Sequence, residues 1–374
     1  MSSPLTRPPT QAEVAALAKV SREAVSHILG GKRANLFSEK TRKKVKAAAQ
    51  QLGYYPHQGA QAMRRGSSNL IVFLHMAGQS ELVAQQAYHT GRLVHENGFN
   101  YQTVDAFWWV GEGQKIIERV LSLKPEGIII AGSPQAIIDF QAFRGAGIPI
   151  VTLNTEIADT FEIRHDVSSA ISKLTVACFD TGKTRPMLLL VKDVPDNYIS
   201  WQQRDRKKGF LSALKKLRLP PPQEFILQNV QKIPDLDGPA IGYIDTKRHA
   251  YFSIYEPGRM AAECIGTAAD AIIASNDNIA VGLLTHYLRN NIDVPGEVAI
   301  SGFDDVSAAI QGKVFLTSVE HPTEKMCEAA MTVLLGQISK KQQRVDQKTF
   351  PCKVIWRESL PAPAKKRKTK KVLK

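Results

Sequence analysis

The sequence predicts a small all-α domain at the N-terminus, followed by an α/β domain built from two parallel-sheet lobes. In the first sixty-six residues, short helical patterns with apolar faces and capping residues follow one another closely. From about residue 70, apolar runs alternate with helix-length amphipathic segments, a pattern typical of parallel sheets covered on both faces. A chain of 374 residues is also too long for one ordinary core.

Composition argues against several classes of protein. The chain contains no run of about 18 apolar residues, which is the length needed to span a membrane. The opening segment MSSPLTRPPT has no apolar core, so we expect no secretory signal. The four cysteines are widely spaced and form no CxxC pair, which argues against a zinc site or disulfides and favours a reducing cytoplasm. We expect neither a metal nor a cofactor.

The positive charge is concentrated at the two ends of the chain. Residues 1–66 hold 12 Lys and Arg against 3 acids, and residues 361–374 hold 7 basic residues and no acid. Of the formal net charge of +14, the residues between therefore carry −2. Basic ends on a neutral body indicate contact with a polyanion at those ends, although solvated lysine runs are the simpler alternative.

Capping residues divide the N-terminal segment into three short helices. Thr10 and Glu13 form a capping box, which predicts a helix ending near Lys19. Ser21 is the expected N-cap of a second helix over 22–29. A third helix begins after Ser38 and stops at Gly53. The predicted buried faces are Val14, Leu17 and Ala18, then Val25, Ile28 and Leu29, and finally Val45, Ala48, Ala49 and Leu52.

This succession predicts a helix-turn-helix module for double-stranded DNA. In such a module the N-terminal half of the second helix enters the major groove and contacts base edges. The candidates for these contacts are Arg22, Glu23, Ser26 and His27. Contacts to the DNA backbone are expected from Thr10, Ser21 and the third helix's lysines, represented by Lys43.

The remainder of the chain predicts buried parallel strands separated by helices. The expected strands cover 70–76, 127–132, 148–153, 186–191, 271–275 and 298–303, and the clearest helices cover 81–97, 112–123 and 276–290. Ligands of open α/β sheets bind beyond the carboxyl ends of the strands. A cleft between two lobes is therefore the expected small-molecule site.

The segments EVAALAKVSREAVSHILGGK and FSEKTRKKVKAAAQQLGYYPHQGAQAMRRG resemble the DNA-binding headpiece of the lac-repressor (LacI/GalR) family of bacterial transcription regulators. Nearly all of the family's pattern is present in order. Three departures stand out. Lys19 occupies a turn position usually held by glycine, so it must tolerate an unusual backbone angle. His27 replaces a common arginine, and the loop KRANLF is slightly long.

The same resemblance implies a hinge helix over 57–66, which in relatives folds in pairs on DNA and wedges an apolar side chain into the minor groove. By position that side chain is Met63, and the other expected minor-groove contacts are Gln58, Gln61 and Arg64. Gly59 lowers helical propensity, which suits a helix formed only in the complex. A plain flexible linker is the alternative.

The segments AIIASNDNIAVGLL, VPGEVAISGFDD, TSVEHP and VIWRES resemble the family's sensor, itself similar to periplasmic sugar-binding proteins. The resemblance implies effector contacts from Arg206, Asp277 and Asp166. The alternatives are a surface ion pair for Arg206 and a helix cap for Asp277. His75, Asn154 and Trp201 lie just past apolar strands and are further candidates, although a large aromatic is more often simply packed.

Two segments have no single interpretation. Residues 241–264 depart from the family pattern and could change the pocket or a subunit contact. The tail from 361 adds DNA affinity or is a solvated, solubilising extension. The predicted domains are a headpiece (1–56), a hinge helix (57–66), a first lobe (67–168 with 296–322), a second lobe (169–295 with 323–359) and a disordered basic tail (360–374).

These observations predict a bacterial, cytoplasmic and nucleoid-associated transcription regulator, expected to be a repressor. A homodimer would bind a pseudo-palindromic operator under control of a small molecule, expected to be a carbohydrate. A sugar-binding protein without DNA function is the alternative, and it would need the secretion signal that is absent. An enzyme has no motif support, since GxGxxG, GxxxxGK[ST], HExxH and GxSxG do not occur.

Overall fold

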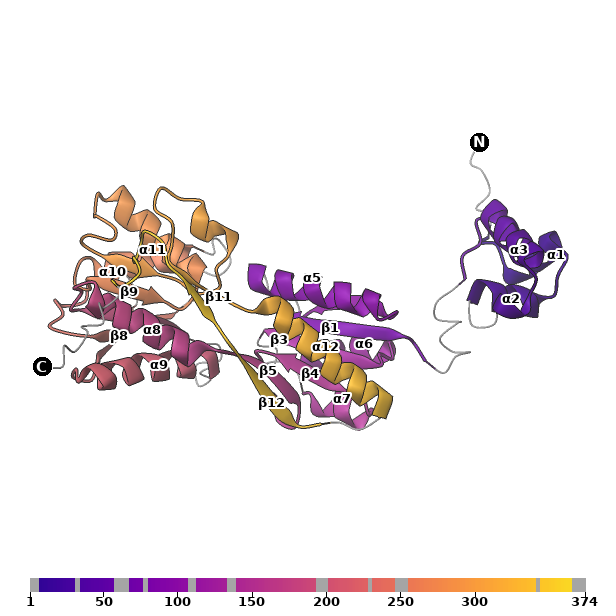
Figure 1. Cartoon of the computed structure of the whole chain (residues 1–374), viewed down its shortest axis with the longest axis horizontal. Coiled ribbons are helices and arrows are strands. Elements are labelled where there is room, and N and C mark those ends of the chain that lie inside the picture. Colours follow the sequence, from indigo (N-terminus) through magenta and orange to yellow (C-terminus); the bar gives the residue numbers. More distant parts are fainter. Residues whose placement is uncertain are drawn as a thin grey trace, which may run out of the picture. The chain divides into compact units, whose positions relative to one another are not determined.

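The structure is a computed structural model, which describes residues 7–30, 34–56, 67–76, 80–106, 112–132, 139–192, 201–227, 231–245, 255–340 and 344–364. The chain divides into two units. The first contains residues 1–70 with 123–126, and the second contains the other residues. Figure 1 labels many of their helices and strands. None of the described helices is long and apolar enough to cross a membrane.

The headpiece, residues 7–56, contains three α-helices. They are α1 (Gln11–Ala18), α2 (Arg22–Gly30) and α3 (Glu39–Leu52), with a short 3-10 helix η1 (Ala34–Leu36) before α3. The predicted capping box is confirmed, because the Thr10 side chain accepts the N–H of Glu13 and the Glu13 carboxylate accepts the N–H of Thr10. Lys19 ends α1 with a φ of 54°, the left-handed conformation that its turn position predicted.

A small apolar core joins the three helices. Val14, Val25 and Val45 have no exposed surface, and alanines and Ile28 fill the space between them. The prediction for Leu17 is wrong, because this side chain is 44% exposed whereas Ala15 is buried. Helix α1 packs on both α2 and α3, so its buried arc centres on Ala18, and Leu17 lies outside that arc.

The second unit contains two parallel sheets, as predicted. The first has the order β12-β5-β4-β3-β1-β2 and the second has the order β10-β9-β6-β8-β7. Strands of the first are β1 (Leu70–Met76), β2 (Asn100–Asp105), β3 (Gly127–Gly132), β4 (Ile150–Leu153), β5 (Phe161–Asp166) and β12 (Asp346–Pro351). Strands of the second are β6 (Pro186–Lys192), β7 (Gln223–Leu227), β8 (Ala240–Asp245), β9 (Ala271–Ala274) and β10 (Ala299–Ser301).

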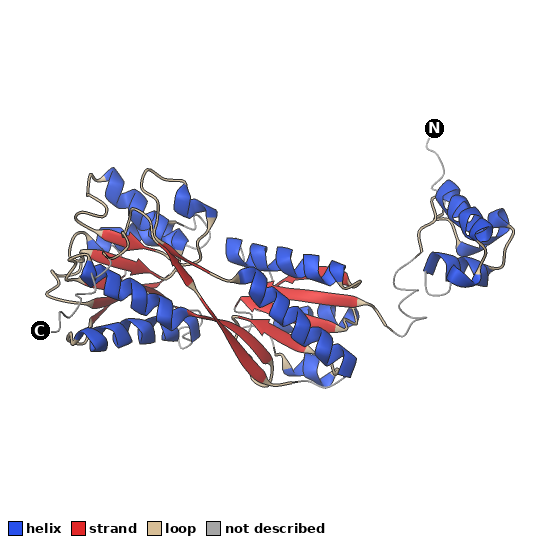
Figure 2. Ribbon diagram, viewed as in Figure 1, coloured by secondary structure: helices blue, strands red, loops and turns tan. Residues whose placement is uncertain are grey.

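Helices cover both faces of each sheet (Figure 2). In the first lobe, α5 (Glu81–Glu96) and α12 (Thr323–Lys340) pack on one face. Alternate strand residues such as Val72 and Ile128 are also fully buried, so the opposite face is covered too. The other first-lobe helices are α6 (Gly113–Ser122) and α7 (Gln141–Gly145).

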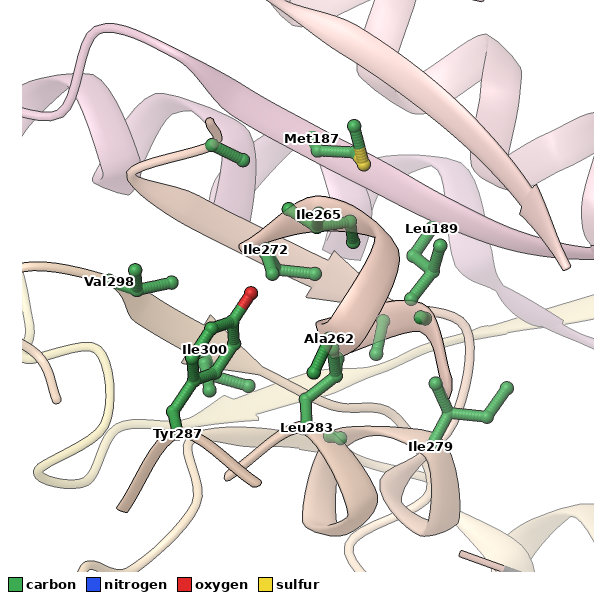
Figure 3. Packing of buried hydrophobic residues seen from close by; sticks show 14 of the residues in the cluster. Met187, Leu189, Ala262, Ile265, Ile272, Ile279, Leu283, Tyr287, Val298 and Ile300 are labelled. Atoms are coloured by element: carbon green, nitrogen blue, oxygen red, sulfur yellow. The ribbon is translucent and has the colours of Figure 1, made fainter. Parts of the chain in front are cut away.

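In the second lobe, α8 (Val167–Asp180) and α9 (Trp201–Leu217) pack on one face of the sheet, and α10 (Glu256–Ile265) and α11 (Asp277–Arg289) pack on the other. Figure 3 shows the core beneath α10 and α11, where Ile272 and Ile300 of the sheet face Ala262 and Leu283. A 3-10 helix, η4 (Ser307–Ile310), follows β10, and the antiparallel pair β11 (Ser318–Glu320) and β13 (Lys353–Ile355) completes the lobe.

The predicted lobe membership of two segments is wrong. Strand β10, within 296–322, pairs with β9 and so belongs to the second lobe. Helix α12, within 323–359, packs on the first sheet through Met326, Ala330 and Leu334, and β12 pairs with β5. An apolar run specifies that a strand or helix is buried, but not which of two similar sheets buries it.

The close crossing of α8 and α9 generates a stability prediction. A Cβ on Gly209 would overlap the main-chain carbonyl of Ser168, whereas a Cβ on Gly336 of α12 would meet no atom within 4 Å. We expect Gly209→Ala to lower the free energy of unfolding by about 1–3 kcal/mol, because the two helices must separate. Gly336→Ala is the control and should leave it unchanged or raise it by up to about 1 kcal/mol. Urea denaturation compares the two, and equal stabilities would contradict the close packing.

Candidate nucleic-acid interface and effector site

Helix α2 presents the four predicted base-contacting residues to different extents. Arg22 and Glu23 are exposed in its first turn, whereas Ser26 and His27 are half-buried. The His27 ring lies 6.3 Å from the Phe37 ring, nearly parallel to it, and its Nε2 is 3.5 Å from the Glu23 carboxylate. Arg22 and Glu23 can therefore reach a ligand, while His27 is oriented by its neighbours.

The three predicted backbone contacts also have structural roles. The Thr10 hydroxyl belongs to the capping box of α1, and the Ser21 hydroxyl accepts the N–H of Ala24 at the start of α2. Lys43 is exposed on α3 and lies 2.9 Å from Glu39. Both hydroxyls thus stand at helix N-termini, where N–H groups favour anions. The predicted minor-groove residues Gln58, Gln61, Met63 and Arg64 lie outside the described residues.

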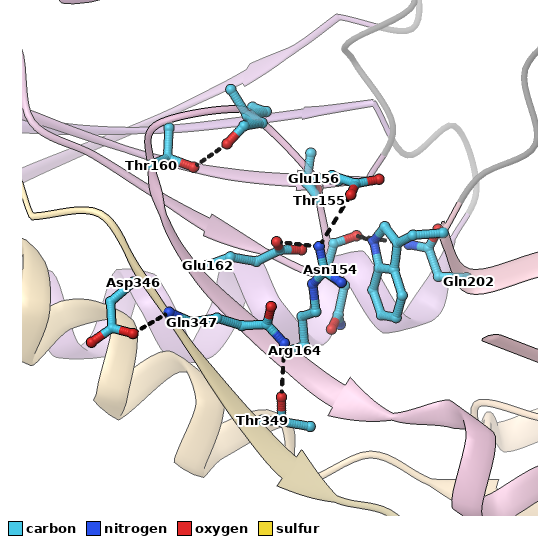
Figure 4. Close-up of polar contacts among 12 residues, drawn as sticks. Asn154, Thr155, Glu156, Thr160, Glu162, Arg164, Gln202, Asp346, Gln347 and Thr349 are labelled. Atoms are coloured by element: carbon cyan, nitrogen blue, oxygen red, sulfur yellow. Dashed lines mark hydrogen bonds and ion pairs between the residues drawn. The ribbon is translucent and has the colours of Figure 1, made fainter. Parts of the chain in front are cut away.

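Asn154 connects the two lobes of the second unit. It follows β4 with a φ of 54°, and its carbonyl oxygen accepts hydrogen bonds from the Trp201 indole and the Gln202 amide at the start of α9, at 3.2 and 2.7 Å. Figure 4 shows this junction beside Glu156 and Arg164. The Arg164 guanidinium lies 4.7 Å from the Trp201 ring centre. Trp201 is only 2% exposed, so its indole is packed between the lobes.

Two histidines adjoin Asn154. The Asn154 side-chain oxygen lies 2.6 Å from His165 Nδ1 and accepts the His165 backbone N–H. The His165 ring meets the His321 ring edge-on at 4.2 Å, and His321 Nε2 lies 2.8 Å from Asp304. Burial, reinforced by His321 and Arg206, holds the pKa of His165 well below its usual value. His165 is therefore neutral at physiological pH.

Phe303 links these histidines to Arg206. Its ring centre lies 5.9 Å from that of His165 and 5.3 Å from that of His321, and the Arg206 guanidinium lies 4.7 Å from it. Arg206 is buried on α9 rather than exposed in a surface ion pair. We call Asn154, His165, Trp201, Arg206, Phe303 and His321 the inter-lobe cluster.

Asp277 adjoins this cluster but its carboxylate is engaged within the protein. One oxygen accepts the Val306 N–H at 2.9 Å and the other accepts the Ser318 hydroxyl at 2.6 Å. The N-cap of α11 is the neighbouring Asn276. Burial, reinforced by the Asp304 carboxylate, raises the pKa of Asp277 well above its usual value. The carboxylate thus anchors the segment after β10.

Asp166 and His75 lie apart from these contacts. The Asp166 carboxylate accepts the N–H of Ser169 and so caps α8. His75, near the end of β1, lies 3.7 Å from Asp105, and burial lowers its pKa although Asp105 opposes the shift. Of the six predicted effector residues, the structure therefore brings Asn154, Trp201 and Arg206 together and places Asp277 beside them.

A cavity of about 520 Å³ lies where the chain passes between the lobes, and its walls include His89, Asp304 and His321. None of the six predicted effector residues lines it. The sequence-based prediction also missed His165, Phe303 and His321 as members of the cluster. His165 directly precedes Asp166, and Phe303 and His321 belong to the GFDD and TSVEHP segments, but no local signal in the sequence predicts a role for these three side chains.

The buried His165 predicts acid sensitivity. In the unfolded chain a histidine takes up a proton near pH 6.5, whereas the folded protein keeps His165 neutral. Stability is therefore fully present above that pH and falls below it. Between pH 6.5 and 5, His165→Gln should make the pH dependence shallower by up to about 1.4 kcal/mol per pH unit. His95→Gln, at an exposed position on α5, is the control. Denaturation at several pH values measures both, and identical slopes for His165→Gln and the wild type would contradict this account.

Comparisons with known proteins agree with this geometry. A model of bacterial regulatory proteins of the lacI family matches residues 10–57, and a model of the periplasmic binding protein-like domain matches residues 178–360. The ribose operon repressor of Bacillus subtilis (strain 168) is 27% identical over 337 residues, which cover 88% of this chain and 91% of that protein.

Solved structures share the fold. A lac repressor dimer bound to operator and the anti-inducer ONPF has a TM-score of 0.71 at 18% identity and covers 95% of this chain and 100% of its own. A CelR–cellobiose complex has a TM-score of 0.62 at 21% identity and covers 94% of this chain and 99% of its own. The chain therefore contains a domain of the lacI family of bacterial regulatory proteins, followed by a periplasmic binding protein-like domain.

Proposed function

We propose that this protein is a transcriptional repressor whose affinity for an operator is set by a small molecule bound between its lobes. The observation that carries the proposal is the exposed first turn of α2, with Arg22 and Glu23, on a helical headpiece that precedes a two-lobed sensor. A function in sugar binding alone would not account for this headpiece and its basic residues.

The headpiece supplies both kinds of DNA contact. Arg22 can donate two hydrogen bonds to guanine O6 and N7, and Glu23 can accept one from cytosine N4. Lys40, Lys43, Lys44 and Lys46 are exposed on α3, and they suit phosphates, which position a protein without specifying sequence. Two headpieces of a homodimer would bind a pseudo-palindromic site. The operator-bound dimer among the similar structures supports this arrangement.

The proposed effector is a carbohydrate or a similar polyhydroxylated molecule. Asn154 Nδ2, His165 Nε2 and His321 Nδ1 are buried and have no hydrogen-bond partner among the described residues. Hydroxyl groups can both donate and accept, so they suit such atoms. The names of two similar proteins, a ribose operon repressor and a cellobiose complex, support the same ligand class.

Arg22 tests the base contact. Arg22→Ala should lower affinity by about 1–3 kcal/mol for the preferred base at one position of each half-site. Lys43→Ala should weaken binding to all sequences alike, because it loses a phosphate contact. Binding to an array of all ten-base duplexes measures both variants. Uniform weakening by Arg22→Ala would make Arg22 a phosphate contact instead.

Met63 tests the proposed hinge wedge. Met63→Ala should reduce the bend of the bound duplex, because the apolar side chain that unstacks a base step is shortened. Affinity for nonspecific DNA should change little, since that affinity depends on charge. Fluorescence energy transfer across a doubly labelled duplex measures the bend, and an unaltered bend would exclude the wedge.

Arg206 tests the effector site. Operator affinity is titrated with a panel of monosaccharides and disaccharides, and we expect at least one to shift it. Arg206→Lys should abolish that shift, because a lysine lacks the guanidinium's planar fork of donors, and should leave operator binding itself intact. The matched control is Lys208→Ala, at an exposed position of the same helix. A full response from Arg206→Lys would remove Arg206 from the effector site.

A further inference from the structure

A carboxylate of the first lobe caps a helix of the second lobe. Glu81 lies in the first turn of α5, and Ser307 is the first residue of η4. Both Glu81 carboxylate oxygens lie 3.1 Å from the Ser307 backbone nitrogen, and one accepts the Ser307 hydroxyl at 2.8 Å. The first N–H groups of a helix have no partner within it. Glu81 thus provides, from the other lobe, the hydrogen-bond acceptor that a neighbouring capping residue normally provides at the start of a helix.

The preceding N–H is held by the second lobe's own carboxylate. Val306 donates to Asp277, and Asp277 also accepts the Ser318 hydroxyl and donates its own N–H to the carbonyl of Phe303. Successive N–H groups at 306 and 307 are therefore bound by carboxylates from opposite lobes. A movement of one lobe relative to the other must alter the contact at 307 while that at 306 can persist.

The turn that immediately precedes these two contacts is strained. Asp304 and Asp305 have φ values of 107° and 50°, so two consecutive residues with side chains adopt the left-handed region. Such conformations persist only where surrounding contacts enforce them. The turn begins at Phe303, which contacts Arg206, His165 and His321, and Asp304 adjoins His321. It therefore connects the inter-lobe cluster to the Glu81–Ser307 contact.

We propose that Glu81 is a positioning residue that couples the angle between the lobes to the conformation of residues 303–307, and through Phe303 to the inter-lobe cluster. Any effect of this coupling on DNA binding rests on the proposed function. When the lobes have the relation seen here, Glu81 holds the strained turn in place. When one lobe rotates away from this relation, Ser307 loses its bonds to the Glu81 carboxylate, and the ring of Phe303 is free to shift against Arg206.

The first test measures amide hydrogen exchange in the full-length, DNA-free protein. Glu81→Ala should speed exchange at Val306 and Ser307 by fivefold or more, although the substitution lies in the other lobe. Glu81→Gln should restore part of the protection, because its amide oxygen still accepts a hydrogen bond. The matched control is Glu112→Ala, which removes an exposed first-lobe carboxylate that is paired, among the described residues, with Lys115 of the same lobe. Unchanged exchange in Glu81→Ala would overturn the proposal.

A second test separates coupling from a purely local cap. The four native cysteines are buried, so spin labels can be attached selectively to Glu118→Cys in the first lobe and Lys215→Cys in the second, both exposed positions. Glu81→Ala should broaden or shift the distance distribution between the labels and change the affinity for a duplex carrying the operator by threefold or more. Glu81→Gln should lie between Glu81→Ala and the wild type.

The outcomes distinguish a failure of the coupling through Glu81 from a failure of the proposed DNA-binding function. Faster exchange with an unaltered label distance would mean that Glu81 only caps η4, and would overturn the coupling. Altered exchange and distance in a protein that binds no DNA would leave the coupling intact and refute the proposed function instead.

Discussion

Three crossings of the chain between the two sheets constrain how the lobes can move. They follow β5 at Asp166, precede α12 at His321, and join β12 to β13 at Cys352. Asp166 and Pro351 are neighbours in the β5–β12 register, so two of the crossings are side by side. Each lobe has its own core, and the crossings therefore permit rotation of one rigid body against the other while preventing separation.

Several buried polar groups lie at or beside this junction. His165 and His321 lie at the crossings themselves, and Asn154 and Asp277 lie at strand or helix ends that face them. Buried groups of this kind are stable only where hydrogen bonds compensate for lost water, so they fix one relation of the lobes closely. A ligand that offers new hydrogen-bond partners to the same groups can therefore favour a different orientation of the lobes. The resulting shift between the two orientations is limited by the difference in the ligand's affinity for them.

The sequence predicted the headpiece better than the sensor. Local signals specify α1 to α3, since Thr10, Ser38 and Gly53 act within a few residues of themselves. The strands β1, β3, β6 and β9 are apolar on both faces and were found. Strands β2, β7 and β12 were not expected, because each has mostly exposed or half-buried residues. Strand β10 joins the second lobe and helix α12 joins the first, the reverse of the prediction. The ring of His165 contacts the ring of His321, which is more than 150 residues away in the chain. Both results depend on tertiary packing, which no local sequence pattern encodes.

The most direct test of the central claim is selection of binding sites from random duplex DNA by the full-length protein at near-physiological salt. If α2 contacts bases in paired headpieces, the selected sites share a pseudo-palindrome whose half-sites are related by two-fold symmetry, with a flexible step such as CG or TA at the centre where the hinge would insert. Recovery of no preferred sequence, with binding that depends only on salt, would contradict the claim that this protein recognises an operator through its headpiece.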